Sequence, residues 1–121
     1  MIDHTTVHVN DIDESKKFYL EVLKPLKYNL VMDFPDMKAA GIGVGGKMDT
    51  WLHGHGAMQP IHIAYQASSR AEVEAFYEAA IAAGGKDNGK PAIREMYHPN
   101  YYAAFVFDPN GHNLEVVYHG E

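Results

Sequence analysis

The sequence predicts an α+β fold, a single domain in which one β-α-β-β-β unit occurs twice. Three observations predict it: an internal repeat in constant register, a helix start within each copy, and short strand-like runs after each helix. In the repeat, residues 2–9 and the pair Phe18-Tyr19 correspond to residues 60–67 and the pair Phe76-Tyr77. A histidine, a helix start and an aromatic pair that match in register indicate duplication of one supersecondary unit.

Each copy begins with a strand that has one polar face. Side chains alternate between the two faces of a strand, so His4 and His8 share a face of the strand expected over residues 2–9. In the second copy, His62 lies on the face that also carries Gln66. The opposite, more apolar face of each strand is expected to pack against the helix that follows it.

Each first strand leads into a helix through a capping box. Asp11 with Glu14, and Ser69 with Glu72, have the spacing that satisfies the free N–H groups of a first helical turn. Helical spacing then predicts which side chains become buried. They are Phe18, Tyr19, Val22, Leu23 and Leu26 in the first helix, and Val73, Phe76, Tyr77, Ala80 and Ile81 in the second.

Three short strand-like runs follow each helix. They are expected at 28–34, 37–44 and 48–53 in the first copy, and at 92–97, 101–107 and 112–118 in the second. Residues 108–111, Asp-Pro-Asn-Gly, are a turn signal. The glycine-rich residues 41–46 predict a hairpin rather than a phosphate loop, because no helix follows them. Module one therefore spans 1–53, the linker 54–60 and module two 61–121.

Composition excludes several classes of function. Ten Lys and Arg residues against sixteen Asp and Glu residues give a formal net charge of -6, and no basic cluster is present to hold a nucleic-acid backbone. No apolar run reaches the roughly 20 residues of a membrane span, and the first residues do not form a signal peptide. We therefore expect a cytoplasmic protein that binds neither nucleic acid nor membrane. Because cysteine is absent, any metal must be held by His and carboxylate.

Three residues are candidate metal ligands. His4 and His62 are equivalent positions of the repeat, and the two imidazoles would meet if the copies pack about a pseudo-twofold axis. Glu115 lies within the apolar strand expected at 112–118, where a carboxylate is costly unless it is paired or bound to metal. Two histidines and one carboxylate leave open coordination positions on a divalent ion.

Other polar and aromatic residues are weaker candidates. His8 shares a face with His4 and is expected either to act as an acid, base or substrate contact, or to lie solvated at the rim. The tyrosines of residues 97–102, among them Tyr102, are expected either to wall a pocket and donate to a substrate oxygen, or to pack with solvated hydroxyls.

The remaining histidines and two arginines are assigned from their places along the chain. Arg70 and Arg94 are possible contacts for an anionic substrate, although nothing in their spacing demands it. The histidines near strand ends, turns or the linker are expected at the surface. They are His53, His55, His112 and His119.

These residues resemble the vicinal oxygen chelate superfamily, which includes glyoxalase I, extradiol dioxygenases, fosfomycin-resistance thiol transferases and bleomycin-binding proteins. The resemblance covers nearly the whole chain. It rests on residues 4–9, Asp11, Phe18-Tyr19, residues 62–64, and the turn 108–111 with Glu115. It implies a curved mixed sheet around a central cavity, helices on the outside, and a homodimer. It also implies that His4, His62 and Glu115 hold one divalent ion: Zn, Ni, Mn or Fe.

One position departs from the pattern of glyoxalase I, which has a fourth ligand on the last strand of the first module. The repeat places Trp51 where the second copy has Glu115, and tryptophan cannot ligate a metal. A register that differs by two residues would place Asp49 there instead, and a carboxylate could ligate. A three-ligand site is typical of the dioxygenase-like and thiol-transferase-like members.

The resemblance implies metal-dependent chemistry on a small molecule that carries two adjacent oxygens. The leading hypothesis is a glyoxalase-like lyase or isomerase, in which Glu115 is both a ligand and a base, with His8 and Tyr102 as further candidate catalytic residues. One alternative is an extradiol-type Fe(II) dioxygenase. Another is a metal-free protein that sequesters a drug or metabolite in the same cavity.

Overall fold

The computed structural model describes residues 2–56 and 58–120. The chain divides into two units, Met1–Gln59 and Pro60–Glu121, and the division falls inside the linker expected at 54–60. Each unit contains one long α-helix and one four-stranded sheet. The predicted α+β class and the twofold repetition of the β-α-β-β-β order are therefore confirmed.

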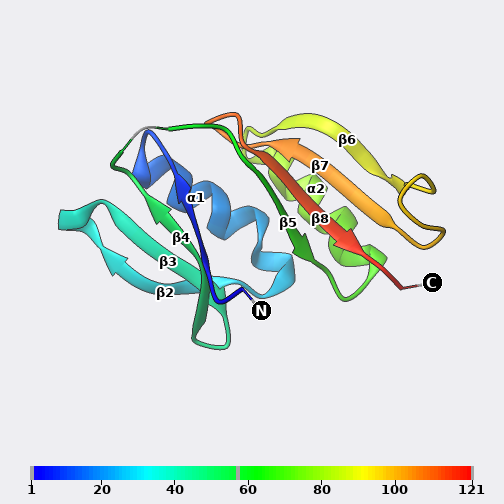
Figure 1. Ribbon diagram of the computed structural model, residues 1–121, viewed down its shortest axis with the longest axis horizontal. Helices are drawn as coiled ribbons and strands as arrows, with labels where there is room; N and C mark the ends of the chain where they lie inside the picture. Colours follow the sequence, from blue (N-terminus) through cyan, green and yellow to red (C-terminus); the bar gives the residue numbers. More distant parts are fainter. Residues whose placement is uncertain (1, 57, 121) are drawn as a thin grey trace. The chain divides into compact units, whose positions relative to one another are not determined.

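The first unit has its first and last strands side by side (Figure 1). Its elements are β1 Thr5–His8, α1 Ile12–Val22, the 3-10 turn Lys24–Leu26, β2 Asn29–Phe34, the 3-10 turn Pro35–Met37, β3 Ala39–Val44 and β4 Lys47–His53. The strand order is β1-β4-β3-β2, in which β1 runs parallel to β4 and the other pairs are antiparallel.

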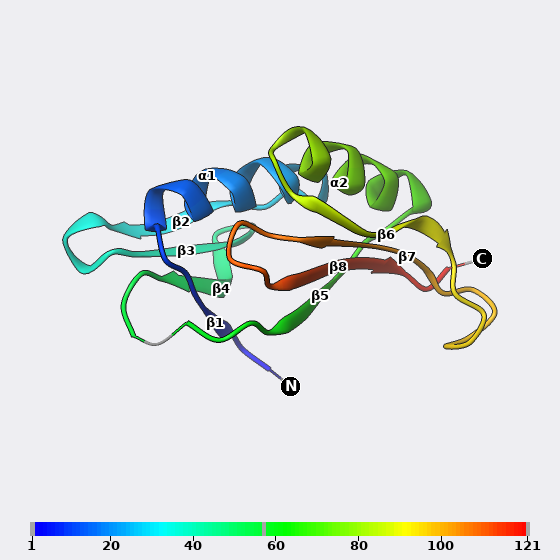
Figure 2. The same cartoon turned by 90° about the horizontal axis from the view of Figure 1, so that it is seen from above.

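The second unit repeats this topology. Its elements are β5 His62–Gln66, α2 Arg70–Ala82, β6 Lys86–Ile93, β7 Tyr102–Phe107 and β8 Asn113–Tyr118. The strand order is β5-β8-β7-β6, again with one parallel pair, β5 with β8. Helix α2 lies along one face of this sheet and packs against β6, β7 and β8 (Figure 2).

Capping and burial follow the predicted pattern. The Asp11 carboxylate and the Ser69 hydroxyl each accept a hydrogen bond from the backbone N–H three residues later, at 3.1 and 3.2 Å. All five apolar residues predicted for the first helix are buried. In the second, Val73, Phe76 and Ala80 are fully buried, but Tyr77 is only half-buried and Ile81 is 41% exposed, so the predictions for these two are wrong. The Tyr77 hydroxyl donates to Asp87, and Ile81 lies in the last turn of α2.

The second strand of the second unit, β6, is displaced from its predicted place. We expected 92–97, but β6 covers Lys86–Ile93 and contains Gly89 and Pro91. Proline has no N–H to give to a ladder, and it is tolerated here because β6 is the outermost strand of its sheet. The pairing of β6 with β7 is also irregular on both sides of Gly89. Because of these irregularities, the sequence of β6 does not alternate as a regular strand does, and its position was not predicted.

The predicted glycine hairpin is confirmed. Gly45 and Gly46, both at positive φ (63° and 78°), connect β3 to β4. Two successive residues at positive φ match the right-handed twist of paired strands, and glycine adopts this conformation without steric cost. Among the described residues, no helix has the length and apolar character needed to cross a membrane.

Candidate functional site

A histidine and a buried carboxylate meet on the second sheet. The parallel pairing of β5 and β8 sets Ala64 opposite Glu115, which brings His62, two residues earlier on the same face of β5, next to the carboxylate. His62 Nε2 lies 2.8 Å from Glu115 Oε1. Glu115 is only 2% exposed, whereas the side chain of His62 is 53% exposed. One partner is thus buried in the sheet and the other is open to a ligand.

Tyr101 completes this group. Its hydroxyl donates to Glu115 Oε2 at 2.5 Å, so each carboxylate oxygen has a partner. Burial, and then the hydrogen bond to Glu115, raise the pKa of Tyr101 well above its ordinary value of 10.0. The sequence placed Tyr101 among tyrosines that might wall a pocket, but the contact depends on how the chain returns from β6 to β7. No sequence spacing could have identified it.

Tyr102 lies in a different environment from Tyr101. Its hydroxyl donates to Glu74 Oε2 on α2 at 2.7 Å, and the Arg70 guanidinium carbon is 4.8 Å from its ring centroid. Neighbouring residues of a strand point to opposite faces, so Tyr102 turns toward the helix when Tyr101 turns toward Glu115. A catalytic role for Tyr102 stays a prediction.

His112 was expected at the surface, and this expectation is wrong. Its side chain is fully buried, and its Nδ1 accepts the backbone N–H of Ile61 at 3.0 Å. Its own backbone N–H donates to Asp108 Oδ1 at 2.8 Å. The turn signal at 108–111 suggested exposure, but the ring folds inward to satisfy a backbone donor at the entry to β5. His112 therefore fixes the start of the strand that carries His62.

In the first unit, His4 and His8 each have local partners. His4 Nδ1 lies 2.8 Å from Asp3 Oδ1, and this hydrogen bond lowers the pKa of Asp3. His8 Nδ1 donates to the carbonyl oxygen of His55 at 2.9 Å. The His8 ring also meets the ring of His53 edge-on, with centroids 5.6 Å apart. His4 and His62 belong to different units, so their joint ligation of a metal stays a prediction.

The registers decide between Trp51 and Asp49 as the counterpart of Glu115. In the first unit β1 residue Thr6 pairs with Trp51, and in the second unit the equivalent β5 residue Ala64 pairs with Glu115. Trp51, and not Asp49, is therefore the register counterpart of Glu115. Asp49 accepts hydrogen bonds from the Tyr28 hydroxyl at 2.5 Å and the Thr50 hydroxyl at 2.9 Å.

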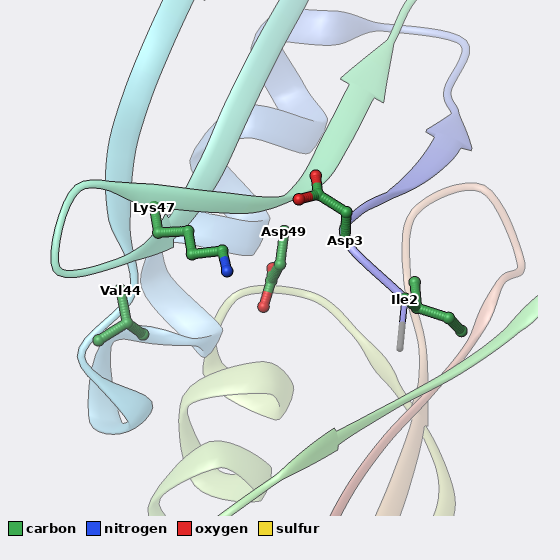
Figure 3. Close-up of a pocket in the computed structure, with 5 residues that line it drawn as sticks. All are labelled: Ile2, Asp3, Val44, Lys47 and Asp49. Atoms are coloured by element: carbon green, nitrogen blue, oxygen red, sulfur yellow. The ribbon is translucent and has the colours of Figure 1, made fainter.

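Asp49 also lines a pocket of about 310 Å³ in the first unit. The other lining residues are Ile2, Asp3, Val44 and Lys47. Figure 3 shows the Lys47 side chain extending toward Asp49. The pocket is therefore lined in part by charged side chains. Asp3, which contacts His4, is one of its lining residues, but His4 itself is not.

The donors of the second unit fit a divalent ion in chemical type. A buried carboxylate and an imidazole nitrogen are 2.8 Å apart, and both are ligands for Zn, Ni, Mn and Fe. To bind a metal through Nε2, His62 would exchange its hydrogen bond with Glu115 for the ion. Among residues 2–56 and 58–120, no three or more His, Asp or Glu side chains gather in a group that could hold a metal ion.

The fold and this site define a class: proteins made of paired β-α-β-β-β modules, with a histidine on a first strand beside a glutamate on a last strand. The comparison of the sequence with known families identifies the family. Residues 1–116 match the Glyoxalase/Bleomycin resistance protein/Dioxygenase superfamily, and the chain belongs to it.

Solved structures support the same fold. A glyoxalase/bleomycin resistance protein from Albidiferax ferrireducens T118 aligns with a TM-score of 0.81 and 24% identity over 98% of both chains. A lactoylglutathione lyase from Agrobacterium tumefaciens aligns with a TM-score of 0.73 and 22% identity, over 98% of this chain and 92% of its own. At these identities the likeness extends to the fold alone. No curated protein matches the sequence.

Proposed function

We propose that this protein is a metal-dependent enzyme of the glyoxalase-like lyase or isomerase type, acting on a small molecule with two adjacent oxygens. The observation that carries the proposal is the 2.8 Å contact between His62 and Glu115, a carboxylate that is 2% exposed. A buried carboxylate is expensive to keep unless its charge is used or compensated. Among the described residues, the ion pair of this carboxylate is with an imidazole that is half open to solvent.

In this proposal His4, His62 and Glu115 hold one divalent ion: Zn, Ni, Mn or Fe. When bound, such an ion acts as a Lewis acid that stabilises negative charge on the substrate oxygens. Tyr101 holds Glu115 Oε2, so a substrate proton would be taken up at Oε1. His8 and Tyr102 are the other residues proposed to handle protons or contact the substrate.

A second candidate is favoured by one observation. Trp51 stands in the register position of Glu115, so the first unit offers no fourth ligand there. A site of two histidines and one carboxylate is the ligand set of Fe(II) oxygenases. An extradiol-type dioxygenase is therefore the alternative reaction for the same residues.

Thermal melts of the metal-stripped protein with Zn²⁺, Ni²⁺, Mn²⁺ and Fe²⁺, combined with elemental analysis, test the proposal. A site-bound ion should stabilise the fold by about 2.7 kcal/mol at a hundredfold excess over Kd. Glu115→Gln and His62→Ala should abolish this shift, whereas His55→Ala, which alters an exposed histidine outside the proposed ligand set, should keep it. A wild-type protein that stays metal-free would instead support a binding protein that sequesters a small molecule.

Activity assays then separate the two reactions. The lyase proposal expects turnover of a hemithioacetal of methylglyoxal with Ni²⁺ or Zn²⁺. The dioxygenase alternative expects oxygen uptake with a catechol and Fe²⁺. The proposal also includes a homodimer in the cytoplasm, which light scattering coupled to size exclusion, and fractionation of the source cells, would test.

A further inference from the structure

Three residues in register on β6, β7 and β8 lie across one face of the second sheet. Gly89 on β6 pairs with Phe105 on β7, and Phe105 pairs with Glu115 on β8. Residues directly opposite in neighbouring strands point to the same side of a sheet. The Phe105 ring therefore shares a face with the Glu115 carboxylate. Its centroid is 6.3 Å from that of His62.

Arg94 adds a positive charge to this face. Its guanidinium carbon lies 5.5 Å from the centroid of Phe105. Phe105 thus adjoins the imidazole of His62 and also the guanidinium of Arg94. The aromatic ring favours a cation at its face, and so Arg94 is held near the proposed site although it is remote from it in sequence.

The backbone shapes the place that Arg94 occupies. A Cβ built on Gly89 would come within 2.9 Å of Arg94 Nη2 and 3.0 Å of the Phe105 ring, so a larger residue there would displace the guanidinium from its present place. Nη2 also donates to the carbonyl oxygen of Lys90 at 2.7 Å. One N–H of the guanidinium is therefore used by the backbone, and its other N–H groups can donate to a ligand.

No carboxylate compensates this charge. Within residues 2–56 and 58–120, Arg94 forms no ion pair. Arg70 is in no ion pair among these residues either, but the ring beside it belongs to Tyr102, whose hydroxyl donates to the carboxylate of Glu74. In a chain with a formal net charge of -6, an arginine that lies beside a ring and has no acidic partner among the described residues is a candidate anion contact.

We infer that Arg94 binds a carboxylate of the substrate, which makes the substrate an anionic molecule with two adjacent oxygens. The inference rests on the proposed function, since it places those oxygens at His62 and Glu115. The guanidinium fork matches a carboxylate in a bidentate manner. Phe105, which contacts both Arg94 and His62, supplies an apolar surface for the part of the substrate between its carboxylate and its two adjacent oxygens. Arg94 is thus a specificity-determining residue.

The test compares two probes that differ only in the anionic group, 3,4-dihydroxybenzoate and catechol. Zn²⁺ is used because it is redox-inert, and binding to the Zn²⁺-loaded protein is measured by calorimetry. The wild type should bind the dihydroxybenzoate roughly tenfold more tightly than catechol, the usual effect of a charged hydrogen bond. Arg94→Gln should remove the preference and leave catechol affinity unchanged. Arg94→Lys should restore part of it, and the matched control Arg70→Gln should keep all of it.

Two kinds of failure can be told apart. In the first kind, Zn²⁺ binds, so the metal site stands, but the role of Arg94 is overturned. This is the result if the wild type binds neither probe, if it does not prefer the dihydroxybenzoate, or if Arg94→Gln retains the preference. If Zn²⁺ does not bind but the preference for the anion is present and depends on Arg94, the proposed function fails and the anion contact survives. Melting curves of each variant establish that it is folded.

Discussion

The Tyr101 hydroxyl donates to Glu115 Oε2 at 2.5 Å, and this contact ties the segment before β7 to the middle of β8. Since His62 engages the other oxygen, the carboxylate is restrained from two sides before any ligand arrives. Groups that orient a metal-binding side chain commonly set its affinity as much as the ligand itself does. Tyr101 is therefore expected to be a positioning residue.

Tyr101→Phe should weaken divalent-metal binding by about 10- to 100-fold, because it frees the Glu115 carboxylate to rotate. Isothermal titration with Zn²⁺ measures this directly. Tyr102→Phe is the matched control, since it removes an equivalent hydroxyl that bonds to Glu74 instead. Equal affinities for the wild type and Tyr101→Phe would show that the hydrogen bond does not position the ligand.

Alkaline stability should depend on the same hydroxyl. The pKa of Tyr101 is raised above 10.0 in the folded protein, so the folded state holds this proton more tightly than the unfolded state does. The resulting stabilisation is complete below pH 10 and is lost as the pH rises through the folded-state pKa. Urea melts of the metal-free protein from pH 8 upward should show a steeper loss above pH 10 for the wild type than for Tyr101→Phe. Parallel curves would contradict this.

Trp51→Glu should convert the first unit into a closer copy of the second. The substitution places a carboxylate in the register position of Glu115, where the native chain has an indole. We expect tighter binding of Ni²⁺ or Zn²⁺ by about tenfold or more, measured by competition with a chromogenic chelator, because a fourth ligand adds to the site. Trp51→Gln serves as the uncharged comparison. An affinity no higher than that of Trp51→Gln would show that this position does not face the metal.

His112→Ala should destabilise the second unit by about 2–4 kcal/mol, because it leaves the Ile61 N–H without its acceptor and opens a cavity. Denaturant unfolding followed by circular dichroism gives the value. Glu78→Ala, at an exposed position of α2, should change the stability by less than about 0.5 kcal/mol. If both variants were equally stable, the buried ring would have no structural role.

Helix capping supplies a paired prediction for the two units. Asp11→Ala and Ser69→Ala should each cost about 1 kcal/mol, because each side chain accepts an N–H of the first helical turn. The costs should be similar, since the two caps are equivalent positions of the repeat. Thermal or urea unfolding measures both, and a cost near zero for either would mean that water replaces the cap.

Most of the fold prediction rested on the internal repeat. The correspondence of residues 2–9 with 60–67 implied that the same strand and helix occur twice, and the capping pairs fixed where the helices begin. Such features are local or periodic, so they can be read without knowing which strands pair. The burial of Glu115 could be predicted for the same reason, because it interrupts an apolar strand.

The features that could not be predicted from the sequence depend on contacts between distant segments. Strand β6 is irregular at Gly89 and Pro91, so its pattern does not alternate and its place was missed. His112 follows a turn, yet it is buried because the chain returns to Ile61. Tyr101 and Tyr102 are neighbours of the same type, and only the arrangement of β7, β8 and α2 decides which one reaches Glu115.

The parallel pairing of β5 with β8 has a consequence for biogenesis. His62 and Glu115 are 53 residues apart, and they come from the first and last strands of their unit. During synthesis on the ribosome the histidine emerges early, but its partner arrives only when the whole unit has been translated. A chain truncated before β8 cannot assemble the pair, so a ligand that needs both residues would bind only after the last strand of the second unit has been made.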